Sequence, residues 1–209
     1  TTELAEPRKI TGWLPSMSSD WVEFWDSKNA LFVDARHEAA HFRRIAEDIR
    51  GYAPNGGNGV MLDYGCGEAR SADLVAEKLT RLILCEAAPN VRGMLAGRYA
   101  GNPRIVVRKP DDLATMAAES VDVVVNFQVI EHLWDQAAFI AECRRVLRPG
   151  GRLLVSTPNR ITFSPGRDTP LNPFHTRELD AAELTDLLTD GGLESVVMHG
   201  VYHGAGLAE

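Results

Sequence analysis

The chain of 209 residues carries a formal net charge of −7, with 44% hydrophobic and 24% charged residues. These values exclude a disordered or fibrous chain, and the length fits one domain with a single core. The negative charge disfavours nucleic acid as a partner, because neutralising phosphates takes clustered Lys and Arg. We therefore expect a small molecule or a neutral polymer as the substrate.

The amino-terminal part, residues 1–57, reads as a helical preface to a core at residues 58–209. Residues 29–50 are predicted to form one amphipathic helix, because apolar residues recur at steps of four and three. Those apolar residues are Ala35, Ala39, Phe42, Ala46 and Ile49. Four aromatic residues precede this helix and fit either a lid over the substrate or plain packing: Trp13, Trp21, Phe24 and Trp25.

The stretch HEAAH at 37–41 has the spacing of a zinc-metalloprotease motif. At about 100° per residue, His37 and His41 fall on the polar face of the helix beside Arg44. A cationic Arg44 opposes zinc there, and the positions of the extended motif that need Gly and a third His hold Arg44 and Glu47. We therefore expect no metal site at this motif, and the sequence shows no other close pair of metal ligands.

After residue 59, apolar runs alternate with amphipathic segments. The expected strands are 60–63, 82–85, 104–107, 120–126, 152–157 and 193–201, and the expected helices are 70–79, 88–99, 135–147 and 181–190. This alternation predicts an α/β fold with a mostly parallel, doubly wound, Rossmann-like sheet and helices on both faces. Asp180 and Glu183 form a capping box for the last helix. The proline-rich connection 158–176 is typical of a loop that covers a site.

The first core strand leads into the glycine loop LDYGCGEARS at 62–71. Ligands bind beyond the carboxyl ends of parallel strands, and Glu86 ends the second strand, where its carboxylate can accept both hydroxyls of a ribose. The third glycine position of a dinucleotide-binding loop holds Arg70, and Asp63 and Glu68 lie beside the loop. Each carboxylate would repel a diphosphate by about 1 kcal/mol or more. The loop therefore favours a cation, such as the sulfonium and ammonium groups of S-adenosylmethionine.

Four motifs in this order resemble the class I S-adenosylmethionine-dependent methyltransferases: DYGCGEARS, LILCEAA, VDVVVNFQVIEHL and RRVLRPGGRLLVSTPN. The resemblance covers about residues 58–200 and implies S-adenosylmethionine as the cofactor. It implies contacts with the methionine end, the ribose, the adenine and the methyl group. The implied cofactor-binding residues are Asp63, Gly65, Cys66, Gly67, Glu86, Ala87, Asp111, Asp112, Asn126 and Phe127, with Asp111 and Asp112 as alternatives for the adenine.

The end of the chain departs from the family pattern. A seventh, antiparallel strand normally follows, yet little more than GAGLAE remains after the strand expected at 193–201. The sheet is therefore expected to end one strand short, or the chain to be truncated. The segment STPNRITFSPGRDTPLNPFHTRELDAAEL is similar to actinobacterial methyltransferases of saccharide-lipid pathways, whereas the front half resembles another branch of the superfamily.

Methyl transfer to a hydroxyl needs a group that removes the proton, and a neutral histidine suits this task. His132, with Glu131 beside it to orient or charge-balance the ring, and His175 in the long loop are the candidate catalytic residues. The alternatives are a packed, idle His132 and a His175 that only fastens the loop. We expect an O-methyltransferase acting on a small molecule or saccharide; a catalytically silent S-adenosylmethionine-binding protein and an NAD(P)-dependent oxidoreductase are the rival functions.

Three cysteines, Cys66, Cys85 and Cys143, are far apart and form no C-x-x-C pair. Neither a disulfide framework nor a thiolate zinc site is indicated, and a reducing cytoplasm suits them. Cys66 in the glycine loop is expected to be a small packing residue. The polar start TTELAEPRK and the lack of an apolar run of about 18 residues lead us to expect neither export nor a membrane span.

Overall fold

A computed structural model of the chain describes residues 19–27, 35–54 and 57–200. The strands are β1 (Gly59–Tyr64), β2 (Leu79–Cys85), β3 (Ile105–Arg108), β4 (Val121–Phe127) and β5 (Leu147–Ser156). The α-helices are α1 (Ser19–Asp26), α2 (Ala35–Tyr52), α3 (Ala72–Ala76), α4 (Pro89–Arg98), α5 (Gln136–Val146), α6 (Arg160–Phe163) and α7 (Ala181–Asp190). Two 3₁₀ helices complete the order, η1 (Pro110–Thr115) and η2 (Ile130–His132).

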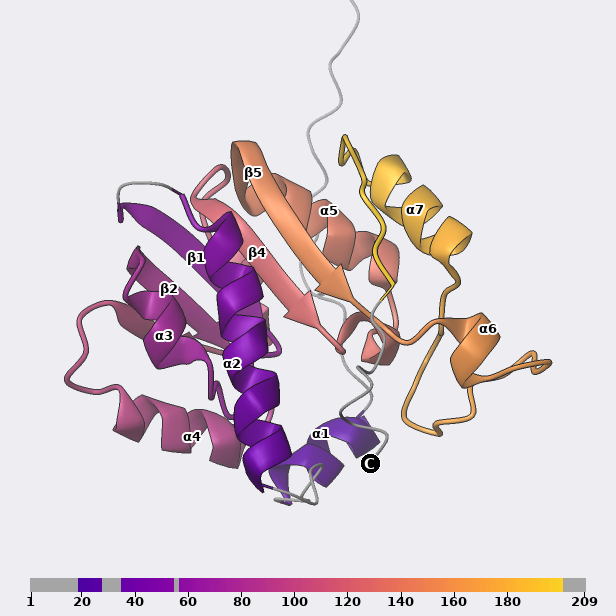
Figure 1. Cartoon of the computed structure of the whole chain (residues 1–209), viewed down its shortest axis with the longest axis horizontal. Coiled ribbons are helices and arrows are strands. Elements are labelled where there is room, and N and C mark those ends of the chain that lie inside the picture. Colours follow the sequence, from indigo (N-terminus) through magenta and orange to yellow (C-terminus); the bar gives the residue numbers. More distant parts are fainter. Residues whose placement is uncertain (1–18, 28–34, 55–56, 201–209) are drawn as a thin grey trace, which may run out of the picture.

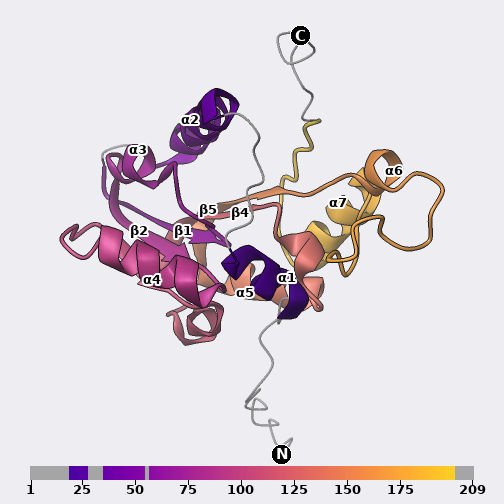
Figure 2. The same cartoon turned by 90° about the horizontal axis from the view of Figure 1, so that it is seen from below.

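The five strands form one parallel sheet in the order β3-β2-β1-β4-β5 (Figure 1). Both faces of the sheet are covered, because alternate strand residues enter two different cores. Met61 and Val123 pack with residues of α2, α3 and α4, whereas Leu62 and Val124 pack with residues of α5 and α7. Figure 2 shows α2 and α3 on one side of the sheet and α5 on the other. The predicted α/β class and the doubly wound arrangement are confirmed.

Most core elements lie close to their predicted bounds, and the capping box of α7 forms as expected. Asp180 accepts the N–H groups of Ala182 and Glu183, while the Glu183 carboxylate accepts the N–H of Asp180. β5 begins five residues before the predicted strand, because Leu147 pairs with Val121 before an irregularity in the register. The long loop after β5 contains a single turn of helix, α6.

The strand prediction for 193–201 is wrong over its described part. Residues 193–200 form no strand, and residue 201 and those beyond it lie outside the described residues. A segment becomes a strand only where a neighbour pairs its backbone groups, and within the described residues β5 pairs only with β4. Leu193 and Val196 still pack on the α5 and α7 core, while Val197 is 72% exposed.

The preface contains two helices. α2 agrees with the predicted helix from Ala35 on, and Ala46 and Ile49 are buried as expected, but Ala39 is exposed. The side chains of His37 and His41 lie outside the described residues, so their predicted orientation stays a prediction. Helix α1 was not anticipated from the sequence. Within the described residues, no helix has the length and apolar character that crossing a membrane requires.

Candidate functional site

The glycine loop and the end of β4 meet at the centre of the sheet. β1 and β4 are neighbours, yet their chains continue to opposite sides, which is the switch point where open α/β sheets bind ligands. Gly65 has φ +81°, and a Cβ atom there would lie 2.3 Å from Cγ2 of Val129, which follows β4. Its N–H donates to the Cys85 carbonyl at 2.8 Å. Only glycine lets the loop after β1 approach the segment after β4 so closely.

Glu86 holds its carboxylate against the glycine loop. The residue is 5% exposed, Oε2 accepts the Gly67 N–H at 2.8 Å, and Oε1 accepts the Ala88 N–H at 2.8 Å. Arg92 donates to the carbonyls of Glu86 and Ala87, which fixes the backbone at the end of β2. An ionised carboxylate accepts about four hydrogen bonds. The two amides therefore orient the group and leave capacity for two ribose hydroxyls.

Asp63 adds a second carboxylate to the same end of the sheet. Its strand partner is Leu84, two residues before Glu86. Burial, followed by the charge of Glu86, raises the pKa of Asp63 to about 7. Burial also raises the pKa of Glu86, although the backbone N–H donors oppose that change. Among the described residues, none forms a hydrogen bond with the Asp63 carboxyl. The charge of Arg92 partly offsets that of Glu86. Two desolvated carboxyl groups at the same end of the sheet still fit a positively charged ligand and oppose a diphosphate.

Three other predicted cofactor residues lie at the end of β4 and in the glycine loop: Asn126, Phe127 and Cys66. Asn126 is fully buried and donates from Nδ2 to the Tyr64 carbonyl at 3.1 Å, while its Oδ1 has no partner among the described residues. Phe127 packs against the core that contains Met61. Cys66 packs in that core too, and burial raises the pKa of its thiol, which agrees with an inert packing residue.

The two adenine candidates differ in their surroundings. Asp112 accepts the Lys109 N–H at 3.3 Å at the start of η1. The Asp111 side chain is 69% exposed and lies 3.4 Å from Nζ of Lys109. Both remain predictions for the adenine contact.

Helix α1 joins the glycine loop to the candidate catalytic residues. A Cβ at Gly67 would lie 2.9 Å from Cζ2 of Trp25, so this ring covers the loop. One turn earlier, Trp21 stacks on His132 with ring centroids 4.0 Å apart and planes 3° apart. Asp26 anchors the helix by accepting the N–H and side-chain amide of Asn90 at the start of α4. Phe24 stacks on Trp21 with ring centroids 5.6 Å apart, so three of the four predicted aromatic residues are placed, and Trp13 lies outside the described residues. The aromatic lid and plain packing both remain predictions.

His132 is 2% exposed and its ring is fixed in one tautomer. Nδ1 lies 3.0 Å from the Phe174 carbonyl, an acceptor, so Nδ1 carries the hydrogen and Nε2 the lone pair. Burial lowers the pKa of His132 to about 4, and the neighbouring His175 contributes in the same direction. Among the described residues, no partner occupies Nε2.

Glu131 is 1% exposed and accepts the Thr157 hydroxyl on Oε2 at 3.0 Å. Burial raises its pKa to about 7. The Glu131 backbone carbonyl accepts the Thr176 N–H at 2.7 Å, which ties the loop after β5 to this residue.

His175 lies edge-on to His132, with ring centroids 4.8 Å apart. Its Nδ1 is 2.6 Å from Oε1 of Glu178, and its Nε2 is 3.0 Å from Nδ2 of Asn172. The structure thus brings together all three predicted catalytic residues. They come from two segments of the chain, and the two histidines are 43 positions apart in sequence. The sequence analysis missed Trp21 and Glu178 as their neighbours; Glu178, three residues after His175, had no distinguishing spacing.

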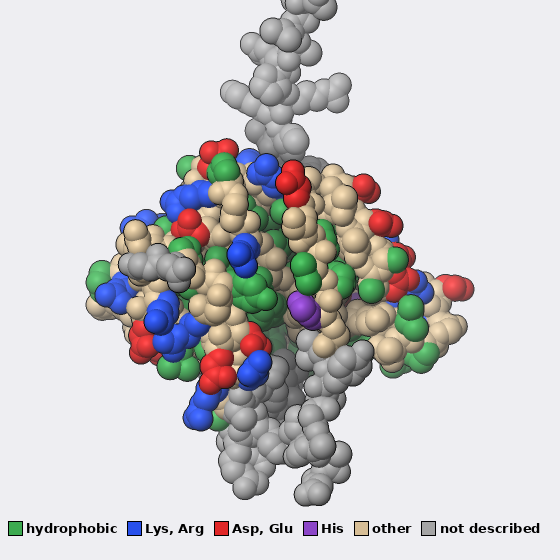
Figure 3. All heavy atoms as spheres, turned by 45° about the horizontal axis from the view of Figure 1, so that its top comes forward, with side chains coloured by type: hydrophobic (Ala, Val, Ile, Leu, Met, Phe, Trp, Pro, Cys, Tyr) green, Lys and Arg blue, Asp and Glu red, His purple; other side chains and the backbone are tan. Residues whose placement is uncertain are grey.

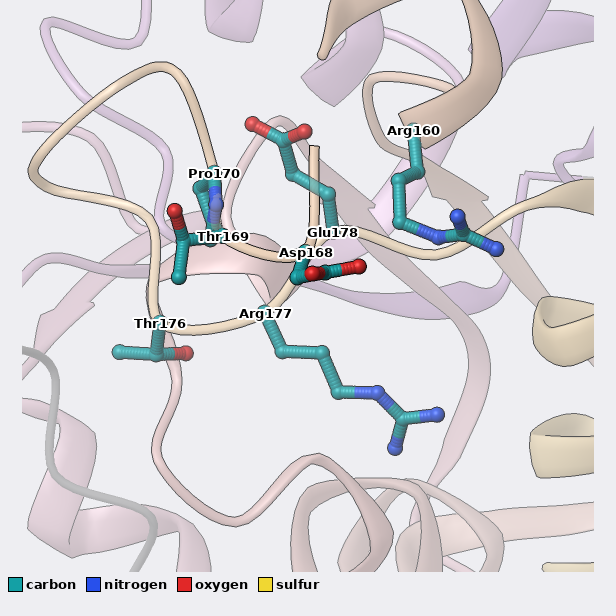
Figure 4. Close-up of a pocket in the computed structure, with 7 residues that line it drawn as sticks. All are labelled: Arg160, Asp168, Thr169, Pro170, Thr176, Arg177 and Glu178. Carbon is teal, nitrogen blue, oxygen red and sulfur yellow. The ribbon is translucent and has the colours of Figure 1, made fainter. Parts of the chain in front are cut away.

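A small cavity is lined by residues of the segment that follows β5 (Figure 4). Its volume is about 90 Å³, and its lining includes Arg160, Asp168, Arg177 and Glu178. Arg160 is held by ion pairs with Asp180 and Glu183. Pockets for cofactor-sized ligands measure roughly 300 Å³ or more, so this cavity is too small to be the cofactor site.

The surface agrees with the composition. On the face shown in Figure 3, Lys and Arg side chains are interspersed with Asp and Glu side chains, and acidic side chains gather at the edge near α7. Among the described residues of this face, no continuous basic surface of the kind that binds nucleic acid is visible.

Comparison with known proteins places the chain. Residues 62–155 match the Methyltransferase domain family. A probable S-adenosylmethionine-dependent methyltransferase of Mycolicibacterium smegmatis is 54% identical over 176 residues, which are 83% of this chain and 64% of that protein. A ubiquinone biosynthesis O-methyltransferase of Cereibacter sphaeroides is 34% identical over 104 residues, 48% of this chain and 41% of that protein.

A solved structure shares the fold. The [4+2]-cyclase SpnF has a TM-score of 0.60 and 21% identity, covering 71% of this chain and 56% of that one. The chain spans about two thirds or less of the length of each of these relatives. The family match, the close relative and the carboxylates at the switch point agree, and the chain belongs to the class I S-adenosylmethionine-dependent methyltransferases.

Proposed function

We propose that this protein transfers the methyl group of S-adenosylmethionine to a hydroxyl group of a small molecule or a saccharide. The observation that carries the proposal is the paired, desolvated carboxyls of Asp63 and Glu86 beside the glycine loop. A sulfonium and an ammonium group relieve the repulsion between two carboxylates, whereas a diphosphate increases it.

In the proposed complex, Glu86 accepts the ribose hydroxyls and Asp63 faces the charged methionine end. The unpartnered Oδ1 of Asn126 would accept a donor of the ligand, since a buried acceptor without a partner costs about 1–3 kcal/mol. The methyl carbon would then lie toward the segment after β4, which carries Glu131 and His132. Trp25 lies against the glycine loop at Gly67, and Trp21, one turn earlier in α1, stacks on His132.

The reaction is an in-line displacement. The acceptor oxygen forms a bond to the methyl carbon while the carbon–sulfur bond breaks and its electron pair stays on sulfur. The hydroxyl proton passes to solvent, and the products are a methyl ether and S-adenosylhomocysteine. We assign the activation of the hydroxyl to Glu131, His132 and His175, the cluster of titratable groups nearest the end of β4.

Support for a hydroxyl acceptor comes from this cluster and from the relatives. The Cereibacter protein is named an O-methyltransferase, and its similarity covers about half of this chain. An acceptor nitrogen with a free lone pair would need no group to remove a proton before attack, whereas a hydroxyl does.

Two experiments test the proposal. Calorimetric titration with S-adenosylmethionine, S-adenosylhomocysteine and NAD should show the first ligand bound and NAD bound weakly or not at all; tight NAD binding without S-adenosylmethionine binding contradicts it. Transfer of an isotope-labelled methyl group to a panel of phenols, sugars and amines, with products identified by mass spectrometry, then separates an enzyme from a silent binder. Methylation confined to amines would refute the hydroxyl assignment.

A further inference from the structure

We propose that Glu131, His132 and His175 form a binding site for one divalent transition-metal ion, with zinc as the best match to these ligands. Metal binding itself is independent of the proposed function, whereas the role of the ion in activating the acceptor rests on it. This inference replaces the expectation, drawn from the HEAAH motif and the cysteine pattern, that the chain holds no metal.

The three side chains already converge. Each offers one ligand atom, and these atoms lie within 4.8 Å of one another. Zinc takes imidazole nitrogen and carboxylate oxygen at about 2.0–2.2 Å, so two ligand atoms of one tetrahedral ion lie roughly 3.3–3.6 Å apart. The most widely separated ligand atoms must therefore approach each other by at most about 1.5 Å, which rotation of the side chains can supply. Two histidines and one carboxylate form the ligand set of catalytic zinc sites that keep a position open.

Both imidazoles are oriented as metal ligands usually are. The Nδ1–H of His132 donates to the Phe174 carbonyl, and the Nδ1–H of His175 donates to the Glu178 carboxylate at 2.6 Å. A metal-binding histidine commonly donates its other ring N–H to a carbonyl or carboxylate, which fixes the tautomer and the ring. Both Nε2 atoms are thus left as lone-pair donors.

Asn172 confirms the tautomer of His175. Its Oδ1 accepts the Phe174 N–H at 3.0 Å, so its amide nitrogen is the atom that faces Nε2 of His175, at 3.0 Å. An amide N–H donor needs an acceptor opposite, so Nε2 carries the lone pair. When an ion binds, the Asn172 amide gives up this contact.

The charge of the cluster also calls for a cation. Glu131 and Glu178 are 1% and 3% exposed, and one carboxylate oxygen of Glu178 has no hydrogen-bond partner among the described residues. Within those residues, neither carboxylate forms an ion pair with Lys or Arg. Buried charges are generally paired or bound to metals, and an ion at His175 would balance both carboxylates.

The open coordination position explains how the site could act. An acceptor hydroxyl bound there would lose its proton to a solvent base more readily, because a bound divalent ion stabilises the alkoxide. The alkoxide oxygen would then attack the methyl carbon as described above. Val129, three residues before His132, touches the glycine loop at Gly65, so the site borders the cofactor loop.

The test uses the full chain after treatment with EDTA and dialysis. Titration with Zn²⁺ by calorimetry should show one ion per chain. Glu131→Gln and His175→Gln should bind at least about tenfold more weakly, and Glu178→Gln, which alters only the outer partner, roughly 10- to 100-fold more weakly. His199→Gln is the matched control, because His199 is exposed and lies outside the cluster. Circular dichroism checks that each variant is folded.

X-ray absorption of the zinc-loaded natural chain supplies a result that needs no variant. Two imidazoles with oxygen neighbours support the site, whereas sulfur neighbours, absence of one-to-one binding, or equal affinity in His175→Gln and His199→Gln overturn it. Methyl transfer is measured separately. Zinc binding without any hydroxyl methylation would refute the proposed function alone, and full methylation by chain that binds no zinc would refute the metal site alone.

Discussion

Replacing Asp63 with Asn should stabilise the ligand-free protein and weaken cofactor binding at the same time. Burial and the charge of Glu86 raise the pKa of Asp63 from 3.8 to about 7. The folded chain therefore binds a proton more tightly than the unfolded chain does. Stability contributed by the protonated group is present below pH 4 and is lost as the pH rises toward 7. Asparagine keeps the shape of the side chain and removes the titration.

The structure sets the magnitude. A difference of about 3 pH units at about 1.36 kcal/mol each gives roughly 4 kcal/mol as an upper limit above pH 7. Rearrangement of the site reduces this value, so we expect Asp63→Asn to raise the free energy of unfolding by at least about 1 kcal/mol at about pH 8. At about pH 5 the advantage should be clearly smaller, because Asp63 is then largely protonated in the natural chain.

Urea unfolding followed by circular dichroism at both pH values measures this effect, and calorimetry measures binding of S-adenosylmethionine. The variant should bind about tenfold or more weakly, a loss of about 1.4 kcal/mol. Asp122→Asn is a suitable control. The Asp122 carboxylate lies outside the glycine loop and forms an ion pair with Arg148, with an N–O distance of 2.6 Å. A variant that is less stable than the natural chain at the higher pH, or equally changed at both, would refute the reasoning.

Three further changes probe the same site. Glu86→Ala should weaken S-adenosylmethionine binding at least about tenfold, measured by calorimetry; unchanged affinity would remove Glu86 from the site. Gly65→Ala should lower the free energy of unfolding by more than about 1–2 kcal/mol, because the positive φ and the nearby Val129 side chain both oppose a Cβ atom. Urea unfolding measures this loss, and adding Val129→Ala to the same chain should recover part of it. Cofactor binding should change tryptophan fluorescence, and Trp25→Phe should remove most of that signal, since this ring covers Gly67; an unaltered signal would contradict the lid.

Sequence patterns predicted the core of the sheet because its strands and helix ends are marked by residues close together in sequence. Apolar runs bounded by glycine and proline mark buried parallel strands, and the capping box at Asp180 depends on neighbours only three residues apart. The strand expected after residue 192 failed for the opposite reason. Leu193 and Val196 pack on the core, but a strand also needs a partner strand, and the residues that could supply one lie elsewhere in the chain.

The candidate site divides in the same way. Gly65, Gly67 and Glu86 could be placed from spacing, because parallel strands present their carboxyl ends at one edge of the sheet. The pKa of Asp63 could not, since it depends on burial and on the charge of a residue in the neighbouring strand. Helix α1 was missed because eight residues with three aromatic side chains give a weak helical pattern, and its position is set by tertiary packing.

The sequence by itself determined the α/β class, the glycine loop and the acidic residues beside that loop, because each follows from residue types at fixed spacing. Only the tertiary structure decided that Glu131, His132 and His175 converge, with Glu178 and the Phe174 carbonyl behind the two imidazoles. Their convergence depends on how the loop after β5 folds back over the end of β4, and no local pattern records that path.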